Sequence, residues 1–259
     1  MDNTASRTGF LTRAMPGAGM SAGGALASLL VVGALLVLAL ATAPIAGLWG
    51  PPAGLAFGLY GVIAIFVLAG LRHHAPRRFG AANGITLLRA AAVSFLAGIA
   101  MLDAPFSPAL RGAVVGIGCA GLLLDGVDGF VARRGGLASR FGARFDMEVD
   151  AISVLVFTLL LLRTGQAGPW VLAIGLARYI FVGVGWLWPA LARELPQSLR
   201  RKTICVVTVT ALLVALTPFV AAGPARMICA AALVVLVYSF AVDCVWSVRI
   251  WRLSKTEQA

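Results

Sequence analysis

Long apolar segments are the feature that most constrains this chain. A bilayer core of roughly 30 Å requires about 20 mainly apolar residues in a helix. Eight stretches approach or exceed that length with only short polar breaks between them, at about 27–49, 54–72, 84–104, 109–132, 147–164, 168–190, 203–222 and 226–248. The chain is 60% hydrophobic and 12% charged, whereas a soluble domain is about 45–50% apolar and about 25% charged. The sequence therefore predicts an all-α, polytopic membrane helical bundle.

Basic residues collect on one side of this predicted bundle. If both termini face the cytoplasm, the basic clusters at 72–78, 133–144, 193–202 and 249–255 all lie on the cytoplasmic side. Only Arg111, Arg163 and Arg226 fall in the opposite loops. This is the positive-inside asymmetry, and it accounts for the net charge of +11 through topology and attraction to anionic lipid headgroups. We expect a multi-pass protein of the cell (inner) membrane, with membrane lipids and no nucleic acid among its partners.

The polar residues divide the chain into three parts. We expect residues 1–24 to form a disordered cytoplasmic tail and residues 25–72 to form an accessory transmembrane hairpin with almost no polar side chains. Residues 73–259 would form a single membrane domain of six helices that contains nearly all the remaining polar residues. Gly165 to Pro169 and the pair Gly223-Pro224 predict tight outside turns. The first apolar run is long for a signal peptide, so we expect it to stay uncleaved.

An acidic cluster is the strongest chemical feature of the sequence. Asp125 and Asp128 are three residues apart and Asp146 and Asp150 are four apart, so each pair shares one face of a helix. Charged groups in spanning helices are costly, and neighbouring carboxylates repel one another. Bound cations would remove both problems. Carboxylate ligands favour Mg²⁺, Mn²⁺ or Ca²⁺ over zinc or copper.

Small and basic residues accompany the aspartates. Residues without large side chains leave room for a ligand to approach the backbone, and guanidinium groups suit phosphate. The small residues are Gly126, Gly129, Ala132 and Gly142, and the arginines are Arg133 and Arg144. Metal ligands, phosphate-binding groups and space for a nucleotide together indicate phosphoryl transfer.

Two motifs resemble those of a known family, the CDP-alcohol phosphotransferases (CDP-alcohol phosphatidyltransferases). Its signature is similar, at every fixed position and gap, to the run Asp125-x2-Asp128-Gly129-x2-Ala132-Arg133-x8-Gly142-x3-Asp146-x3-Asp150. Its opening motif is similar to Asn83-Gly84-Ile85-Thr86-Leu87-Leu88-Arg89, although Ala82 stands where the family often has proline. The family has a six-helix core, which corresponds to about two-thirds of this chain.

The resemblance implies an activity and a set of site residues. The implied reaction is metal-dependent transfer of a phosphatidyl (phospho-alcohol) group from a CDP-alcohol donor to a hydroxyl acceptor with release of CMP, in phospholipid biosynthesis. Two divalent ions, Mg²⁺ or Mn²⁺, would be held by Asp125, Asp128, Asp146 and Asp150, and Asp150 would also be the general base. The implied nucleotide-binding residues are Asn83, Thr86, Gly129, Ala132, Arg133 and Gly142. Members of the family commonly form homodimers.

Four basic residues outside these motifs are weaker candidates for binding the acceptor or a phosphate, namely Arg144, Arg178, Arg200 and Lys202. Three of these four residues have an alternative role. Arg178 could instead pair with Asp243 in the last helix, and the cluster that contains Arg200 and Lys202 could instead be a positive-inside anchor. Glu148 is expected to support the site rather than to bind a metal.

The acceptor is not determined by the sequence. The residues around the third and fourth aspartates, from Phe145 to Ala151, match no single acceptor group of the family. CDP-diacylglycerol with a small polar acceptor is the first choice, and a CDP-choline or CDP-ethanolamine donor with diacylglycerol is the alternative. A cation transporter is a hypothesis of a different class, but a transporter should distribute its carboxylates through the membrane depth.

Overall fold

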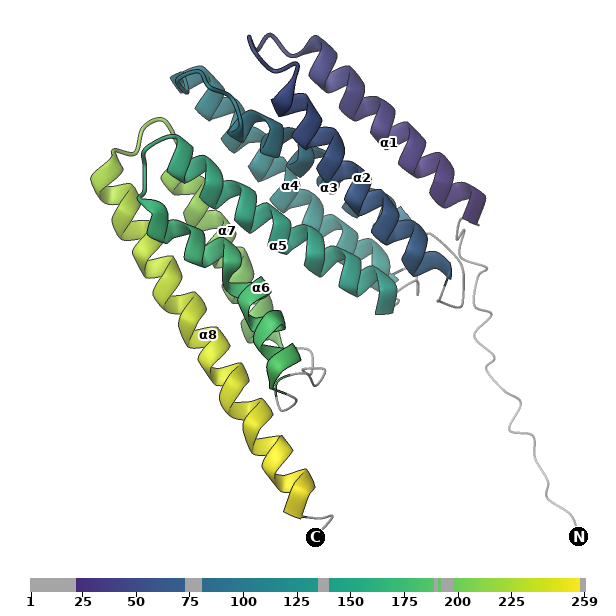
Figure 1. Ribbon diagram of the computed structural model, residues 1–259, viewed down its shortest axis with the longest axis vertical. Coiled ribbons are helices and arrows are strands. Elements are labelled where there is room, and N and C mark those ends of the chain that lie inside the picture. The colour runs from purple at the N-terminus through teal and green to yellow at the C-terminus, as the bar shows by residue number, and fades with distance from the viewer. Residues whose placement is uncertain (1–21, 73–80, 135–139, 189–190, 192–197, 257–259) are drawn as a thin grey trace, which may run out of the picture.

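The chain forms a helical bundle in the computed structural model, which describes residues 22–72, 81–134, 140–188, 191 and 198–256. Side chains are described for 24–70, 81–126, 141–188, 191 and 198–251. Within the described residues there are α-helices, one short 3₁₀ segment and no strands, so the all-α prediction is confirmed. The elements, shown in Figure 1, are α1 (Ala22–Thr42), α2 (Pro51–Arg72), α3 (Ala81–Ala100), α4 (Pro108–Arg134), α5 (Arg140–Arg163), η1 (Pro169–Val171), α6 (Leu172–Leu187), α7 (Leu199–Leu216) and α8 (Ala222–Thr256).

Local sequence signals explain where several helices begin and end. The Ser107 hydroxyl accepts the backbone N–H of Leu110 at 3.1 Å, which caps the first turn of α4. At the end of α5, Gly165 adopts a φ of 70°. The N–H of Gly165 bonds to the carbonyl of Leu162, and that of Gln166 to the carbonyl of Leu161. These two bonds form a Schellman motif, which confirms the turn predicted there.

Several predicted boundaries were wrong. Helix α5 begins at Arg140, seven residues before the apolar stretch that was predicted to begin at 147, and α8 continues to Thr256. Apolar length measures only what the bilayer requires, whereas a helix can continue through charged residues at its end. The pair Gly223-Pro224 lies inside the first turn of α8 rather than in the preceding turn, because proline is tolerated at the start of a helix.

Helices α3 and α5 lie at the centre of the bundle. Helix α3 packs against α1, α2, α4 and α5, and α5 packs against α3, α6 and α7. In Figure 1, α1 and α2 lie on one side of this pair and α6 to α8 on the other. Helices α1 and α2 form a hairpin, and a hydrogen bond joins them: the Tyr60 hydroxyl on α2 donates to the carbonyl of Leu29 on α1 at 2.7 Å.

Apolar surface on the outside of the bundle indicates a membrane environment. Large hydrophobic side chains such as Val62, Ile65, Leu123 and Val234 are exposed around the helices, where a soluble protein would place polar residues. By length and composition, six spans in the described chain are long and apolar enough to cross a membrane. They are Gly24–Thr42, Pro51–Gly70, Ala81–Ala100, Pro108–Gly126, Pro169–Leu187 and Ala222–Trp251. Helices α5 and α7 were also predicted to span, but both carry charged clusters in their first turns.

Candidate functional site

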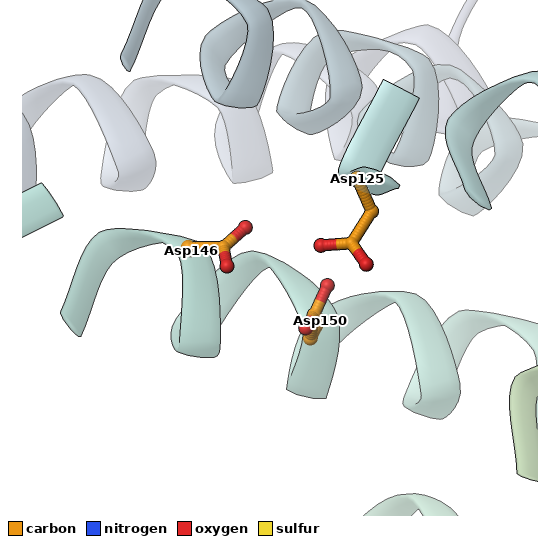
Figure 2. A group of neighbouring side chains, drawn as sticks. All are labelled: Asp125, Asp146 and Asp150. Carbon is orange, nitrogen blue, oxygen red and sulfur yellow. The ribbon is translucent and has the colours of Figure 1, made fainter. Parts of the chain in front are cut away.

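Three of the four predicted aspartates lie together at one end of the bundle. Asp125 is on the last part of α4, and Asp146 and Asp150 are one turn apart near the start of α5. Figure 2 shows the three carboxylates directed into a shared space between the two helices. One carboxylate oxygen from each residue lies within 4.8 Å of the others. The antiparallel run of α4 and α5 thus brings the two halves of the acidic motif face to face.

Arg89 on α3 contacts all three carboxylates. Its Nη1 is 2.6 Å from an oxygen of Asp146 and 3.3 Å from an oxygen of Asp125, and its Nη2 donates to Asp150. The arginine side chain is 6% exposed. A buried cation with three anionic partners satisfies the rule that buried charges must be paired. One positive charge of the chain itself therefore faces the three carboxylates.

The carboxylates differ in their access to solvent. The side chain of Asp125 is 11% exposed, whereas those of Asp146 and Asp150 are 35% and 27% exposed. The two α5 carboxylates can therefore meet a group entering from outside, while Asp125 and Arg89 close the inner wall of the site.

The residues present fit a divalent cation. If all three carboxylates are ionised, they carry three negative charges, and Arg89 contributes one positive charge. The cluster then has a net charge of −2. Mg²⁺ and Mn²⁺ take oxygen ligands, and carboxylates commonly supply them. The fourth predicted ligand, Asp128, follows one turn after Asp125 on α4. Its side chain lies outside the described side chains.

Sequence comparison assigns the fold and the acidic motif to a family. The sequence model described as CDP-alcohol phosphatidyltransferase matches residues 79–243, which is more than half of the chain. This chain belongs to the CDP-alcohol phosphatidyltransferase family. Searches of curated proteins and of solved structures find no match. The matched range begins after the α1–α2 hairpin and contains the whole acidic motif.

Membership of the CDP-alcohol phosphatidyltransferase family confirms the predicted resemblance and makes the chain a membrane transferase. CDP-alcohol phosphotransfer is its general activity. The family is typically dependent on divalent metals, which agrees with the carboxylate cluster on α4 and α5.

The predicted nucleotide-binding residues lie on the three helices that carry the carboxylates and Arg89. Asn83 and Thr86 lie in the first two turns of α3, one to two turns before Arg89, and Gly142 lies one turn before Asp146 on α5. The Thr86 hydroxyl donates to the carbonyl of Ala82 at 3.1 Å. The other three predicted residues, Gly129, Ala132 and Arg133, lie on α4 beyond the last described side chain.

The predicted pairing of Arg178 with Asp243 was wrong. Arg178 on α6 donates to Glu148 on α5, and Asp243 on α8 accepts from Arg200 on α7. Arg200 also bonds to the carbonyl and hydroxyl of Ser239 at 2.9 Å. Two interhelical ion pairs therefore replace the one that was predicted, because each arginine reaches the acid on the helix packed directly against its own.

The remaining two weak candidates lie on α5 and α7. Arg144 is an exposed residue on the second turn of α5, between Gly142 and Asp146. Lys202, in the first turn of α7, is near enough for its positive charge to act on the carboxylate of Asp146.

Arg89 is the residue of this site to which sequence reasoning gave no role. It was visible only as the last residue of the opening motif. A signal for it existed, because an arginine in the middle of an otherwise apolar span requires an anionic partner or a functional reason.

Proposed function

We propose that this chain transfers a phosphatidyl group from a CDP-alcohol, with CDP-diacylglycerol as first choice, to a hydroxyl acceptor with release of CMP. The observation that carries this proposal is the carboxylate cluster of Asp125, Asp146 and Asp150 at the facing ends of α4 and α5, within the matched family region. The reaction would serve phospholipid biosynthesis. Exposed apolar surface around the bundle allows a lipid donor to remain in the bilayer while its headgroup reaches the cluster.

The proposed ligands of two divalent ions, Mg²⁺ or Mn²⁺, are Asp125, Asp128, Asp146 and Asp150. Such ions would neutralise the charge of the donor diphosphate and stabilise the charge that develops on the leaving group. The partly exposed carboxylates on α5 support this assignment, because they can be reached by both an ion and a substrate. Arg89 would hold these carboxylates in place from the buried side.

Asp150 is the proposed general base. It would accept the proton of the acceptor hydroxyl while the acceptor oxygen forms a bond to the phosphorus that carries the alcohol. The bond from that phosphorus to the bridging oxygen of the diphosphate breaks, and CMP leaves with the electron pair. Since Arg89 donates to Asp150, the carboxylate is held in a fixed orientation as it receives the proton.

The proposed cytidine diphosphate site lies beside the cluster. Asn83, Thr86 and Gly142 border it from α3 and α5, and the α4 residues Gly129, Ala132 and Arg133 complete the proposed set. Arg144 and Lys202 are the better placed of the weaker phosphate candidates. Arg178 and Arg200 each already have a carboxylate partner, which supports a structural role for both.

The positive-inside asymmetry supports a cytoplasmic position for the site and both termini in the cell (inner) membrane. The beginning of α5 and the end of α8 lie toward the same end of the bundle in Figure 1. We further propose the division into an accessory hairpin at 25–72 and a transferase domain at 73–259.

The test is CMP release by purified full-length protein. CDP-diacylglycerol is supplied with Mg²⁺ or Mn²⁺, and serine, glycerol 3-phosphate and inositol 1-phosphate are offered in parallel. Acceptor-dependent release should fall about 10²–10⁴-fold in Asp150→Asn, the range for loss of a general base. Asp103→Asn is the matched control, because Asp103 is fully exposed and lies beyond the far end of α3.

Each outcome of this assay separates the hypotheses. Acceptor-dependent release that is lost in Asp150→Asn and kept in Asp103→Asn supports the proposal and identifies the acceptor. Release only with CDP-choline or CDP-ethanolamine and diacylglycerol would instead favour the alternative donor. Absence of release with every donor would contradict the proposed activity.

A further inference from the structure

The α1–α2 hairpin lies outside the matched family region, yet it contacts the start of α5 beside the carboxylate cluster. We infer that α2 positions the metal-binding turns of α5 through an aromatic clamp, made of Phe66 on α2 and Phe141 and Phe145 on α5. This inference rests on the proposed metal site. It gives the hairpin a part in the reaction that membrane anchoring alone would not.

The clamp is a compact cluster of three rings. The ring centroid of Phe66 lies 6.1 Å from that of Phe141 and 6.4 Å from that of Phe145, and the two α5 rings are 6.0 Å apart. These separations fall within the range of favourable aromatic pairs. Phe145 is 1% exposed and Phe141 is 6% exposed, so both rings are enclosed by the bundle.

Gly70 shows how closely α2 approaches the clamp. A Cβ at this position would lie 2.1 Å from Cε2 and 2.5 Å from Cδ2 of Phe141. Real side chains do not approach so closely, so any residue larger than glycine forces the ring to move. The absence of a side chain at Gly70 therefore fixes the depth at which Phe141 sits against α2.

The clamp is joined to the carboxylate site through the backbone of α5. Phe145 immediately precedes Asp146, and Phe141 immediately precedes Gly142. Successive helical residues differ by about 100° in direction, so Phe145 and Asp146 lie on adjacent faces of the first turns of α5. Movement of the rings would rotate or shift these turns and change the position of Asp146 relative to Asp125 on α4. Ligand geometry tolerates errors of only about 0.5 Å.

The test is Mn²⁺ binding by purified full-length protein, measured by electron paramagnetic resonance of free Mn²⁺ without substrate. Gly70→Ala adds one methyl group against the clamp and does not weaken the helix, since alanine is the best helix former. We expect its Mn²⁺ dissociation constant to rise about tenfold, as for other losses of groups that orient metal ligands. Phe141→Leu removes Cε2 and Cζ and leaves a Cδ2 that the smaller, branched side chain can turn away from position 70, so the double variant Gly70→Ala/Phe141→Leu should recover most of the affinity.

Gly98→Ala is the matched control. Gly98 on α3 also packs against the hairpin, and a Cβ there would lie 2.8 Å from the carbonyl oxygen of Pro52 at the other end of α2. This variant should lower the thermal unfolding temperature without changing Mn²⁺ affinity. If the hairpin only stabilised the bundle, Gly70→Ala and Gly98→Ala would change the Mn²⁺ dissociation constant to the same extent.

The outcomes distinguish the inference from the function on which it rests. Weaker binding in Gly70→Ala alone, with recovery in the double variant, supports the clamp. Strong binding by the wild type and an unchanged constant in folded Gly70→Ala would overturn the clamp while leaving the metal site in place. Absence of binding by the wild type would overturn both.

Discussion

Arg89 places one buried positive charge among three carboxylates that belong to two other helices. Its contacts join α3 to both α4 and α5. Removal of one partner from a buried ionic cluster is costly because the remaining charges stay buried and unpaired. Arg89 is thus expected to stabilise the site most strongly in the absence of bound cations.

Arg89→Met should therefore make stability more dependent on metal. We expect a loss of about 3 kcal/mol in the cation-free protein, as for a broken buried ion pair. Added Mg²⁺ should restore part of this loss, because a divalent ion compensates the same carboxylates. The measurement is the thermal unfolding temperature in detergent with EDTA and with Mg²⁺, and the Mg²⁺-induced increase should be larger in the variant than in the wild type.

Arg111→Met provides the control for that experiment. Arg111 on α4 also joins two helices, but it donates to the carbonyl oxygens of Leu216 and Thr217 rather than to carboxylates. Its removal should lower the unfolding temperature with and without Mg²⁺ by the same amount. Equal Mg²⁺-induced increases in the two variants would contradict the role given to Arg89.

The sequence predicted the aspartates of the site but not their partners. The spacing of Asp146 and Asp150 requires only helical geometry, which is local and regular. The partner of Arg178 depends on which helices pack together and at what depth, and neither is contained in local spacing. In the structure Arg178 pairs with Glu148 and Arg200 pairs with Asp243. In each pair the long arginine side chain reaches an acid on a neighbouring helix.

At the scale of helices, close contact between α5 and α6 is made possible by Gly175. A Cβ at this position would lie 2.7 Å from the Cα of Leu155 and 2.6 Å from Oγ1 of Thr158. Small residues at interfaces let membrane helices approach closely, since dispersion contacts replace the hydrophobic effect between helices in lipid. This contact holds α6 against the helix that carries Asp146 and Asp150.

Gly175→Ala should destabilise the bundle by about 1–3 kcal/mol, the usual cost of overpacking a well-packed interface. The obstruction includes the backbone of Leu155, which cannot turn away. Gly183→Ala in the same helix is the control, because no heavy atom outside its local helix lies within 4 Å of a Cβ there. Unfolding midpoints should decrease in the first variant and stay constant or increase in the second, and equal decreases would contradict the close packing.

The number of helices was predicted well from the apolar segments, whereas the ends of the helices were predicted poorly. Apolar segments of bilayer length identify helices because the lipid imposes that length. The charged residues from Arg140 to Asp146 extend α5 beyond its apolar part, and hydropathy gives no signal there. The Schellman turn at Gly165 was predictable because glycine readily adopts the required positive φ.

At the scale of the whole molecule, the α1–α2 hairpin lies outside the matched family range, which begins at residue 79. Helices α3 to α8 hold the acidic motif, and α1 and α2 cover α3 and reach α5 through Phe66. The sequence indicated the hairpin as a separate element because it has almost no polar residues. Its contact with the start of α5 could not be predicted, because apolar residues that face lipid and those that face protein look alike in sequence.

The dependence of CMP release on Mg²⁺ is the sharpest test of whether the carboxylates on α4 and α5 form the metal site of a transferase. The assay compares wild type and Asp146→Asn over a wide range of Mg²⁺ concentrations, with the donor and acceptor identified in the substrate panel. We expect no release in EDTA, and a half-saturating Mg²⁺ concentration at least about tenfold higher in the variant, because a ligand oxygen is lost. Release that persists in EDTA, or the same half-saturating concentration in both proteins, would contradict a metal-dependent transferase built on these carboxylates.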